Sequence, residues 1–383
     1  MRMKKVAVVT ATRAEYGILR PLITRLDKDE EIELQLLVTG THLSEKYGRT
    51  ENEIVKDGFL IYERVPILEE GNSSYDVSCT MANAIKGFAD YFRREKPALL
   101  VVLGDRTEML GVCSAAMNER IPIAHLHGGE LTEGAVDDCV RHAITKMSYL
   151  HFPAAETYRE RIIRLGEQPE RVYNVGALGV ENILKTPLFS YEELCKETGI
   201  PVGMKYIVVT FHPVTLEAGK EMEQVDALIK AMSEKEEYFY LITKANADVG
   251  GEAVNARFEA FCASVSNAKL VASLGMKRYL SAVKYSEFVL GNSSSGIIEA
   301  PALGTPTVNI GDRQKGRLMA ETVIQCGTTT DVIIEAMEKA ANMQHSPTVL
   351  FGDGNTSEKI VSVIKEFLRQ DRVDLKKKFY DGI

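Results

Sequence analysis

Three consecutive serines follow a short apolar run and precede a segment with helical spacing. The apolar run is Glu287 to Leu290, the serines are Ser293, Ser294 and Ser295, and the helical spacing covers Gly296 to Leu303. A helix N-terminus has free backbone N–H groups and a positive dipole end, and small hydroxyl residues let an anion approach them. The stretch therefore predicts a phosphate site. On its own, Ser293 is better explained as a helix N-cap.

The next expected strand brings further ligand-binding groups to the same end of the sheet. Thr305 to Ile310 is typical of a strand, and Arg313 follows it with a forked cation that can grip a pyrophosphate. Glu299, five residues after Ser294, offers a partner for ribose hydroxyls. Alone, Arg313 would be an ordinary surface charge. The combination indicates a nucleotide site.

Carboxylates in the first half of the chain have the composition of a proton-transfer site. Asp105 follows an apolar run, Glu130 ends the stretch His-Leu-His-Gly-Gly-Glu, and Asp137 begins a helical segment. If the three converge in one pocket, repulsion and desolvation raise the pKa of at least one and separate acid from base roles. A helix cap for Asp105 and a helix-dipole partner for Asp137 are the structural alternatives.

Histidines occur near both the carboxylates of the first half and the nucleotide site of the second half. His125 and His127 are two residues apart on an expected strand, which would place them on one face. With Asp137 or Asp138 they could bind zinc, but no further His or Cys has ligand spacing, so we expect a polar wall of a cleft and no metal. His212 follows an apolar strand in the second half and is expected to meet the pyrophosphate or act as an acid.

The remaining candidates lie in loops after expected strands. Arg13 follows the first strand and can reach a phosphate, and Gly17 would allow a ligand close to the backbone. Arg106 follows Asp105 directly. For His42, after the second strand, a structural hydrogen bond and a ligand contact are equally open.

Strands and helices must alternate to position these residues. The expected strands are Lys5 to Thr10, Glu33 to Thr39, Ala98 to Leu103, Ile121 to Leu126, Tyr149 to Phe152, Arg171 to Val175, Tyr206 to Phe211, Tyr238 to Thr243, Lys269 to Ala272, Glu287 to Leu290 and Thr305 to Ile310. Helical spacing fills most intervals. The alternation predicts an α/β protein with two doubly wound, Rossmann-like domains facing a central cleft, and ligands at the carboxyl ends of the strands.

The length of 383 residues suits two domains. We expect an N-terminal domain over 1–185 carrying the carboxylates, a linker over 186–205 marked by Pro187, Pro201 and Gly203, a nucleotide-binding domain over 206–355, and a C-terminal helix and tail over 356–383. The charged stretch Arg369 to Lys378 is expected to be solvated.

Composition excludes several classes of function. A net charge of −8 argues against nucleic acid as a partner, and no apolar run is long enough to span a bilayer. The six cysteines lack disulfide or zinc spacing, which favours a cytoplasmic protein. No G-x-G-x-x-G follows a strand and no Walker loop is present, so NAD is not expected. Apolar helices such as Met109 to Met117, if exposed, would suit a homodimer.

Taken together, the motifs resemble those of the hydrolysing UDP-N-acetylglucosamine 2-epimerases of bacterial sialic-acid and legionaminic-acid synthesis. They run in order through nearly the whole chain: Thr-Arg-Ala-Glu-Tyr-Gly, Leu-Gly-Asp-Arg, His-Leu-His-Gly-Gly-Glu, Asp-Asp-x-x-Arg-His-x-Ile-Thr-Lys, Phe-His-Pro-Val-Thr, Gly-Asn-Ser-Ser-Ser-Gly-x-x-Glu and Gly-Asp-Arg-Gln-x-Gly-Arg. The resemblance implies a GT-B fold and the conversion of UDP-N-acetylglucosamine and water to N-acetylmannosamine and UDP, without a cofactor.

The resemblance also implies roles for individual residues. Asp105 and Asp137 match the family's catalytic acids, and its UDP contacts match Arg13, Gly17, Arg106, His212, Ser293, Ser294, Glu299 and Arg313. His42, Arg141 and Ser295 complete the candidate substrate-binding set. Some relatives carry a catalytic Glu where this chain has His127, so that role passes to Glu130 or to His127 itself.

The sugar is left open at this point. The His127 form looks closer to the branch that includes enzymes for UDP-N,N'-diacetylbacillosamine, so that substrate stands beside UDP-N-acetylglucosamine. A GT-B glycosyltransferase with the same nucleotide site, a non-hydrolysing epimerase and a sugar-nucleotide sensor without turnover are the remaining alternatives.

Overall fold

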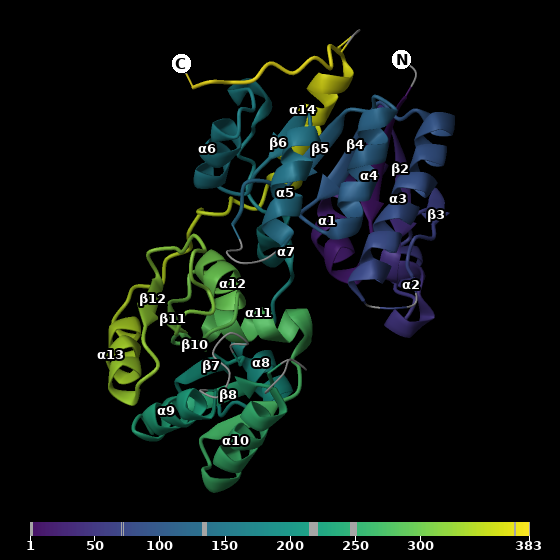
Figure 1. Cartoon of the computed structure of the whole chain (residues 1–383). Coiled ribbons are helices and arrows are strands. Elements are labelled where there is room, and N and C mark those ends of the chain that lie inside the picture. The colour runs from purple at the N-terminus through teal and green to yellow at the C-terminus, as the bar shows by residue number, and fades with distance from the viewer. Residues whose placement is uncertain are drawn as a thin grey trace. The chain divides into compact units, whose positions relative to one another are not determined.

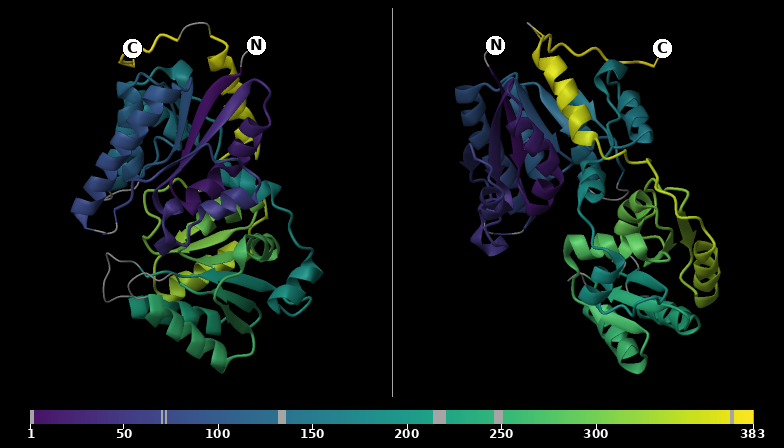
Figure 2. Two further views of the ribbon diagram at one scale, coloured as in Figure 1. Left: turned by 90° about the vertical axis from the view of Figure 1, so that its right-hand side faces the viewer. Right: turned by 180° about the vertical axis from the view of Figure 1, so that it is seen from behind.

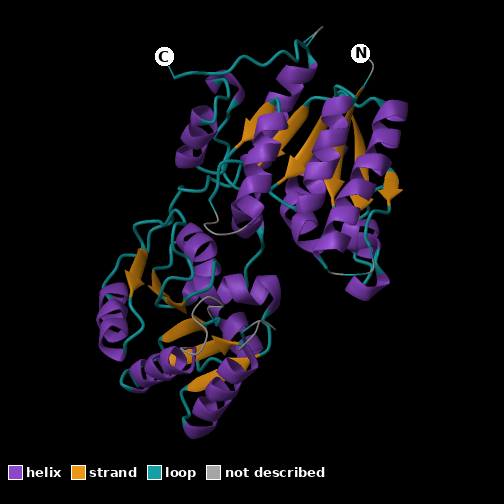
Figure 3. Cartoon of the chain, viewed as in Figure 1, coloured by secondary structure: helices purple, strands orange, loops and turns teal. Residues whose placement is uncertain are grey.

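The computed structural model describes residues 3–69, 71, 73–131, 136–213, 221–245, 251–370 and 373–382. The chain divides into two compact units (Figure 1). Unit 1 comprises Met1–Asn182 and Phe351–Ile383, and unit 2 comprises Ile183–Leu350. In each unit, helices cover both faces of a sheet of strands (Figure 3).

The sheet of unit 1 has six parallel strands in the order β3-β2-β1-β4-β5-β6. Its central strands are nearly continuous apolar runs, as expected for strands that are covered on both faces. Strand order reverses between β1 and β4, which makes their carboxyl ends the switch point where open α/β sheets bind ligands. The strands are β1 Lys4–Thr10, β2 Ile32–Thr39, β3 Glu63–Val65, β4 Leu99–Leu103, β5 Ile123–Leu126 and β6 Leu150–Phe152.

The helices of unit 1 include one from the far end of the chain. Helix α14 packs beside α1, where Arg25 Nε donates to Ser357 Oγ at 2.8 Å (Figure 2, α14 in yellow). Buried Glu181 accepts from the Ser357 backbone N–H at 2.6 Å and from its hydroxyl at 2.7 Å. The helices are α1 Arg13–Asp27, α2 Glu51–Lys56, α3 Ser74–Glu95, α4 Thr107–Asn118, α5 Val136–Met147, α6 Glu156–Arg164, α7 Leu178–Lys185, which crosses the unit boundary, and α14 Thr356–Leu368, with 3-10 turns η1 Gly40–Leu43, η2 Glu45–Tyr47 and η3 Pro169–Arg171.

Unit 2 repeats this topology. Its parallel strands follow the order β12-β11-β10-β7-β8-β9, so the switch point lies between β7 and β10. The strands are β7 Tyr206–Thr210, β8 Phe239–Thr243, β9 Ala268–Val271, β10 Val289–Gly291, β11 Thr307–Ile310 and β12 Val323–Cys326. The helices are α8 Tyr191–Thr198, α9 Glu221–Ser233, α10 Gly251–Ser264, α11 Gly275–Tyr285, α12 Ser295–Leu303 and α13 Thr330–Ala341.

The predicted fold class, two doubly wound α/β sheets, is confirmed. The short strands β3 and β12 and helix α13 were not predicted. The predicted strand Arg171 to Val175 is wrong, since only Val172 makes a bridge, with His151. Arg171 instead ends the 3-10 turn η3, and the left-handed Gly176, with φ of 87°, directly follows the predicted segment.

The expected linker and tail both carry ordered contacts. Segment 186–205 contains α8 and groups with unit 2, whereas 356–383 groups with unit 1. In the tail, Lys377 Nζ donates to buried Glu167 at 2.6 Å and to the carbonyl oxygens of Ser148 at 2.7 Å and Lys146 at 2.9 Å. The prediction of a wholly solvated tail is therefore wrong at Lys377.

The helix Met109 to Met117 is not an exposed apolar surface. Met109, Val112 and Cys113 are fully buried within unit 1, and only Met117 at its end is exposed. This corrects the feature on which the homodimer was predicted. Among the described residues, no helix combines the length and hydrophobicity needed to cross a bilayer.

Candidate active site

Most of the predicted site residues lie at the two switch points. In unit 1, Arg13 begins α1 shortly after β1, and the loop after β4 carries Asp105 and Arg106. In unit 2 the loops after β7 and β10 carry His212 and Ser293. The topology of each sheet thus delivers these residues to the edge where doubly wound sheets bind ligands.

Arg141 connects the acidic groups of unit 1. Its guanidinium is buried on α5 and donates to the Asp105 carboxylate, to Asp138 Oδ1 at 2.6 Å and to the Glu130 carbonyl oxygen at 2.9 Å. A planar, permanently charged fork can make several such bonds at once. Arg141 therefore holds the loops after β4 and β5 against the first turns of α5.

His127 and Glu130 form a side-chain pair in the loop after β5. His127 Nδ1 lies 3.0 Å from Glu130 Oε1. Nε2 of His127 is buried and has no hydrogen-bond partner among the described residues. The His127 backbone has φ of 60°, an uncommon conformation for a residue other than glycine, and its N–H donates to the Phe152 carbonyl. Strain of this kind is frequent at functional sites.

His125 is a structural neighbour of this pair. It is fully buried, with Nε2 2.7 Å from the Gly104 carbonyl oxygen and Nδ1 3.2 Å from Thr145 Oγ1. Burial lowers the pKa of His125 to about 3, so it stays neutral. The prediction that His125 and His127 share a strand face is wrong, because β5 ends at Leu126 and His127 turns out of the strand.

Asp137 lies in the first turn of α5 and is exposed. The carboxylate that pairs with Arg141 from this turn is that of Asp138. Residues 132–135, immediately before α5, lie outside the described part of the chain.

Glu15 was missed as a site residue. It is buried at the start of α1, where Oε2 accepts from the Ala11 backbone N–H at 3.0 Å and Oε1 has no partner among the described residues. Burial raises the pKa of Glu15 to about 7, although nearby Arg106 opposes the shift. The available signal was the Thr-x-x-Glu spacing of a capping box from Thr12.

Arg106 interacts with three carboxylates, those of Glu108, Glu15 and Asp105. Its Nε donates to Glu108 Oε1 at 2.6 Å. Burial alone would lower the pKa of Arg106, but Glu108, and then Glu15 and Asp105, raise it. Arg106 is therefore held as a cation at the β4 end of the switch point.

Three other candidates in unit 1 differ in exposure. Arg13 is exposed at the first position of α1 and pairs with Glu53 at 2.9 Å. Gly17 faces open space, since a Cβ on it would meet nothing within 4 Å. His42 is fully buried, with Nε2 3.0 Å from Thr10 Oγ1 and Nδ1 2.8 Å from Thr50 Oγ1. Of its two predicted roles, these contacts supply the structural one, and burial lowers its pKa to about 4.

The serine loop of unit 2 leads into α12 as predicted. Ser294 occupies the N-cap position, and Ser293 Oγ accepts from the Ser295 backbone N–H at 3.3 Å. Glu299 is half-buried on the same helix, and burial raises its pKa. The hydroxyl oxygens of Ser295 and Tyr279 are buried. Tyr279, on α11, had no sequence signal.

A network of hydrogen bonds joins His212 and Arg313 to this loop. The His212 backbone bonds to the side chain of Asn292, and Arg313 donates to the Asn292 carbonyl oxygen at 3.1 Å. Asn292 and the neighbouring Gln314 were not predicted as site residues.

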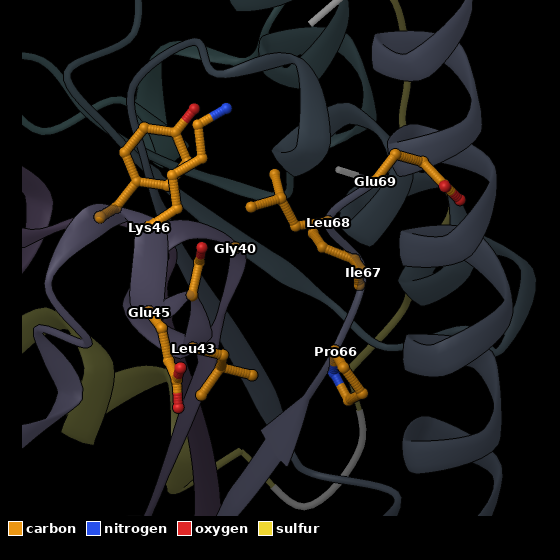
Figure 4. A pocket seen from close by; sticks show the side chains of 10 residues that line it. Gly40, Leu43, Glu45, Lys46, Pro66, Ile67, Leu68 and Glu69 are labelled. Carbon is orange, nitrogen blue, oxygen red and sulfur yellow. The ribbon is translucent and has the colours of Figure 1, made fainter. Parts of the chain in front are cut away.

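Unit 1 also has a cavity of about 480 Å³ at the carboxyl ends of β2 and β3. Figure 4 shows Leu43 and Leu68 between the segment that follows β2 and the segment that follows β3. The cavity is lined by Gly40, Leu43, Ser44, Glu45, Lys46, Tyr47, Pro66, Ile67, Leu68 and Glu69. It lies at the same edge of the sheet as the switch point but contains none of the predicted site residues.

Comparison with known proteins identifies the family of the chain. The family model for UDP-N-acetylglucosamine 2-epimerase matches residues 24–365. The chain belongs to the UDP-N-acetylglucosamine 2-epimerase family. The resemblance noted in the sequence motifs is thereby confirmed, and the chain is an enzyme of UDP-sugar 2-epimerisation.

Relatives within the epimerase family cover most of the chain. A Campylobacter jejuni protein named GDP/UDP-N,N'-diacetylbacillosamine 2-epimerase (hydrolyzing) is 40% identical over 85% of this chain and 84% of its own. The Escherichia coli polysialic acid biosynthesis protein P7 is 38% identical over 99% of this chain and 98% of its own. The structure of the Neisseria meningitidis UDP-GlcNAc 2-epimerase bound to UDP-GlcNAc matches with a TM-score of 0.77, at 18% identity over 94% of this chain and 100% of its own. The epimerase fold therefore extends through both units.

Proposed function

We propose that the chain is a hydrolysing epimerase that converts UDP-N-acetylglucosamine and water to N-acetylmannosamine and UDP. In the first step a base removes the C2 proton and UDP leaves from C1, which yields 2-acetamidoglucal. Water then adds its hydroxyl group to C1, and a proton returns to C2 on the opposite face. The name of the Campylobacter jejuni relative supports hydrolysis.

Unit 2 binds UDP in this proposal. The C2 proton is weakly acidic, so stabilising the departing diphosphate must supply much of the catalysis. The N-terminus of α12, with Ser293 and Ser294, offers backbone donors and a positive dipole end. Arg313, held against the same loop, adds a forked cation, and Glu299 serves the ribose hydroxyls.

Unit 1 transfers the protons, and its Arg141 network is the observation that carries this proposal. One buried guanidinium holds Asp105, Asp138 and the loop of His127 and Glu130 together at the sheet edge. An elimination followed by a hydration needs separate groups for removing and returning protons, and this cluster supplies them.

The contact between His127 and Glu130 supports His127 as the proposed base. Glu130 accepts the Nδ1 proton, which leaves the Nε2 lone pair of His127 to take a proton from C2. In this assignment His127 contacts the sugar and Glu130 orients it. Asp105 and Asp137 are the remaining acids, one of which returns the proton on the other face.

UDP-N,N'-diacetylbacillosamine is the second candidate substrate. The Campylobacter jejuni relative that is named for this sugar is 40% identical to this chain, and the Escherichia coli polysialic acid protein is 38% identical to it. Both sugars carry the C2 acetamido group and the C1 diphosphate on which the reaction depends. The same proton transfers therefore serve either substrate.

The reaction is tested with UDP-N-acetylglucosamine in deuterated water, without added metal. NMR and mass spectrometry should show UDP and N-acetylmannosamine with one deuterium at C2. Product without deuterium would contradict the elimination route. UDP-linked N-acetylmannosamine would indicate a non-hydrolysing epimerase, and turnover only with an added sugar acceptor would indicate a glycosyltransferase. Parallel kcat/KM values with UDP-N,N'-diacetylbacillosamine decide between the two sugars.

The base assignment is tested with His127→Gln and Glu130→Gln. We expect His127→Gln to lower kcat by about 10²- to 10⁴-fold, the usual contribution of a general base. UDP should inhibit both variants as well as it inhibits the wild type. A smaller loss for His127→Gln than for Glu130→Gln would reverse the two roles.

The proposed pathway is bacterial synthesis of sialic-type acids in the cytoplasm. A homodimer is proposed as the working form, although α4, the helix from which it was predicted, is mostly buried within unit 1. The name of the Escherichia coli relative supports the pathway. Light scattering tests the dimer, which should have twice the chain mass of 42.5 kDa.

A further inference from the structure

Asn292 lies in the loop after β10 and makes hydrogen bonds to the loops after β7 and β11. Its side chain is fully buried at the end of β10. Oδ1 accepts from the His212 backbone N–H at 2.7 Å, and Nδ2 donates to the His212 carbonyl oxygen at 2.8 Å. The orientation of the amide is fixed, because a backbone N–H can only donate and a carbonyl can only accept.

The backbone of Asn292 is engaged as well. Its N–H donates to the Thr210 carbonyl oxygen at 3.1 Å. Its own carbonyl oxygen accepts from Arg313 at 3.1 Å and from Gln314 Nε2 at 2.9 Å. Asn292 therefore ties together the loops after β7, β10 and β11, which are neighbouring strands at the switch point.

We infer that Asn292 is a positioning residue that sets the geometry of His212 and Arg313 around the diphosphate. This inference rests on the proposed function of unit 2 as the UDP-binding unit. His212 and Arg313 are far apart in sequence, but both bond to this one amide residue. Ser293, the first residue of the anion loop, follows Asn292 directly, so any shift of Asn292 moves all three groups.

An aspartate in place of Asn292 is a sharp test because it keeps the size and removes one donor. A carboxylate oxygen would then face the His212 carbonyl oxygen, leaving two acceptors without a proton between them. The added negative charge would also lie next to the loop that binds the diphosphate. Both effects should weaken UDP binding more than folding.

The chain offers a matched control at Asn255. Its Oδ1 accepts from the Ala245 backbone N–H at 2.8 Å and its Nδ2 donates to the Ala245 carbonyl oxygen at 3.4 Å. This is the same amide-to-backbone pairing in the same unit. Asn255 lies on α10 and Ala245 follows β8, so the pair is not at the switch point between β7 and β10. Asn255 is half-buried and Asn292 is fully buried, so Asn255→Asp tests whether the same change in an amide paired with the backbone affects UDP binding when it lies away from the diphosphate loop.

The experiment measures UDP affinity by calorimetry and the melting temperature for the wild type, Asn292→Asp, Asn292→Ala and Asn255→Asp. We expect Asn292→Asp to weaken UDP binding at least about tenfold, the effect of losing one charge-assisted contact. Asn255→Asp should keep wild-type affinity at a comparable melting temperature. Equal UDP affinity in Asn292→Asp and the wild type would overturn the inference.

A double-mutant cycle shows whether Asn292 acts through its partner. If it positions Arg313, the double variant Asn292→Ala with Arg313→Ala should lose less affinity than the sum of the two single losses. Strictly additive losses would contradict a positioning role. A wild type that binds UDP but forms no product would contradict the proposed function and leave the affinity comparison valid.

Discussion

Arg141 and Asp105 are bonded across unit 1, although one lies on helix α5 and the other in the loop after β4. Arg141→Lys keeps the charge but cannot reach Asp105, Asp138 and the Glu130 carbonyl oxygen together. We expect kcat to fall about 10²-fold, as for a misplaced catalytic group, with UDP affinity within about twofold of wild type. Steady-state kinetics and UDP inhibition measure both quantities.

The control for Arg141→Lys is Arg159→Lys. Arg159, on α6, bonds to Glu156 at 2.9 Å and to the Val172 carbonyl oxygen at 2.9 Å, away from the switch point. It should leave kcat unchanged. Unchanged kcat in Arg141→Lys as well would show that the network does not position the acids.

Gly17→Ala separates folding from ligand binding. Gly17 lies inside α1, and a Cβ on it meets nothing within 4 Å. Alanine should therefore stabilise the free protein by about 0.5–1 kcal/mol, since glycine is costly within a helix. If UDP approaches this backbone as predicted, the same methyl group raises KM. A higher melting temperature with unchanged KM would remove Gly17 from the site.

The features that could be predicted from sequence were those set by local pattern. Apolar runs located the central strands, and the polar residues after them fell at the switch points because parallel strands end at one edge. Strand β3 was missed because Glu63 to Val65 is a short edge strand with two charged residues. The strand expected at Arg171 has suitable residues, but Arg171 ends a 3-10 turn that begins at Pro169, and Val172 alone forms a bridge.

Contacts between distant segments could not be predicted. The bond from Arg141 to Asp105 and the pairing of Asn292 with His212 depend on strand order, which no local pattern reveals. The exposure of Asp137 relative to Asp138 depends on the rotation of α5. The left-handed conformation of His127 had no signal either, because such backbone strain is maintained by the surrounding structure.

Glu15→Gln should change how stability depends on pH. The pKa of Glu15 is raised from 4.5 to about 7, mainly by burial, so the folded protein binds this proton more tightly than the unfolded chain. Its contribution is fully present below pH 4.5 and is lost as pH rises to about 7. Glutamine keeps an acceptor for the Ala11 N–H and has no proton to lose.

The measurement for Glu15→Gln is the melting temperature at pH 5 and pH 8. The melting temperature of the variant relative to that of the wild type should rise from pH 5 to pH 8, and the variant should be the more stable protein at pH 8. A constant difference between the two proteins would show that Glu15 does not titrate in this range.

Lys377→Met tests whether the C-terminal tail stabilises unit 1. Burial would raise the pKa of Glu167, but hydrogen bonds from His151, Lys146 and Lys377 lower it to about 2. The stabilising effect of its carboxylate is therefore present above the unfolded value near 4.5 and is lost as pH falls through about 2. Losing one charged donor should cost about 1–3 kcal/mol at pH 7.

The neighbouring exposed Lys376→Met is the control and should cost nothing measurable. Thermal unfolding at pH 7 and pH 3 should show a smaller gap between Lys377→Met and wild type at the lower pH, because Glu167 without this donor has a higher pKa in the variant and takes up its proton at a higher pH than in the wild type. A gap of equal size at both values would mean that Lys377 stabilises the unit by packing alone.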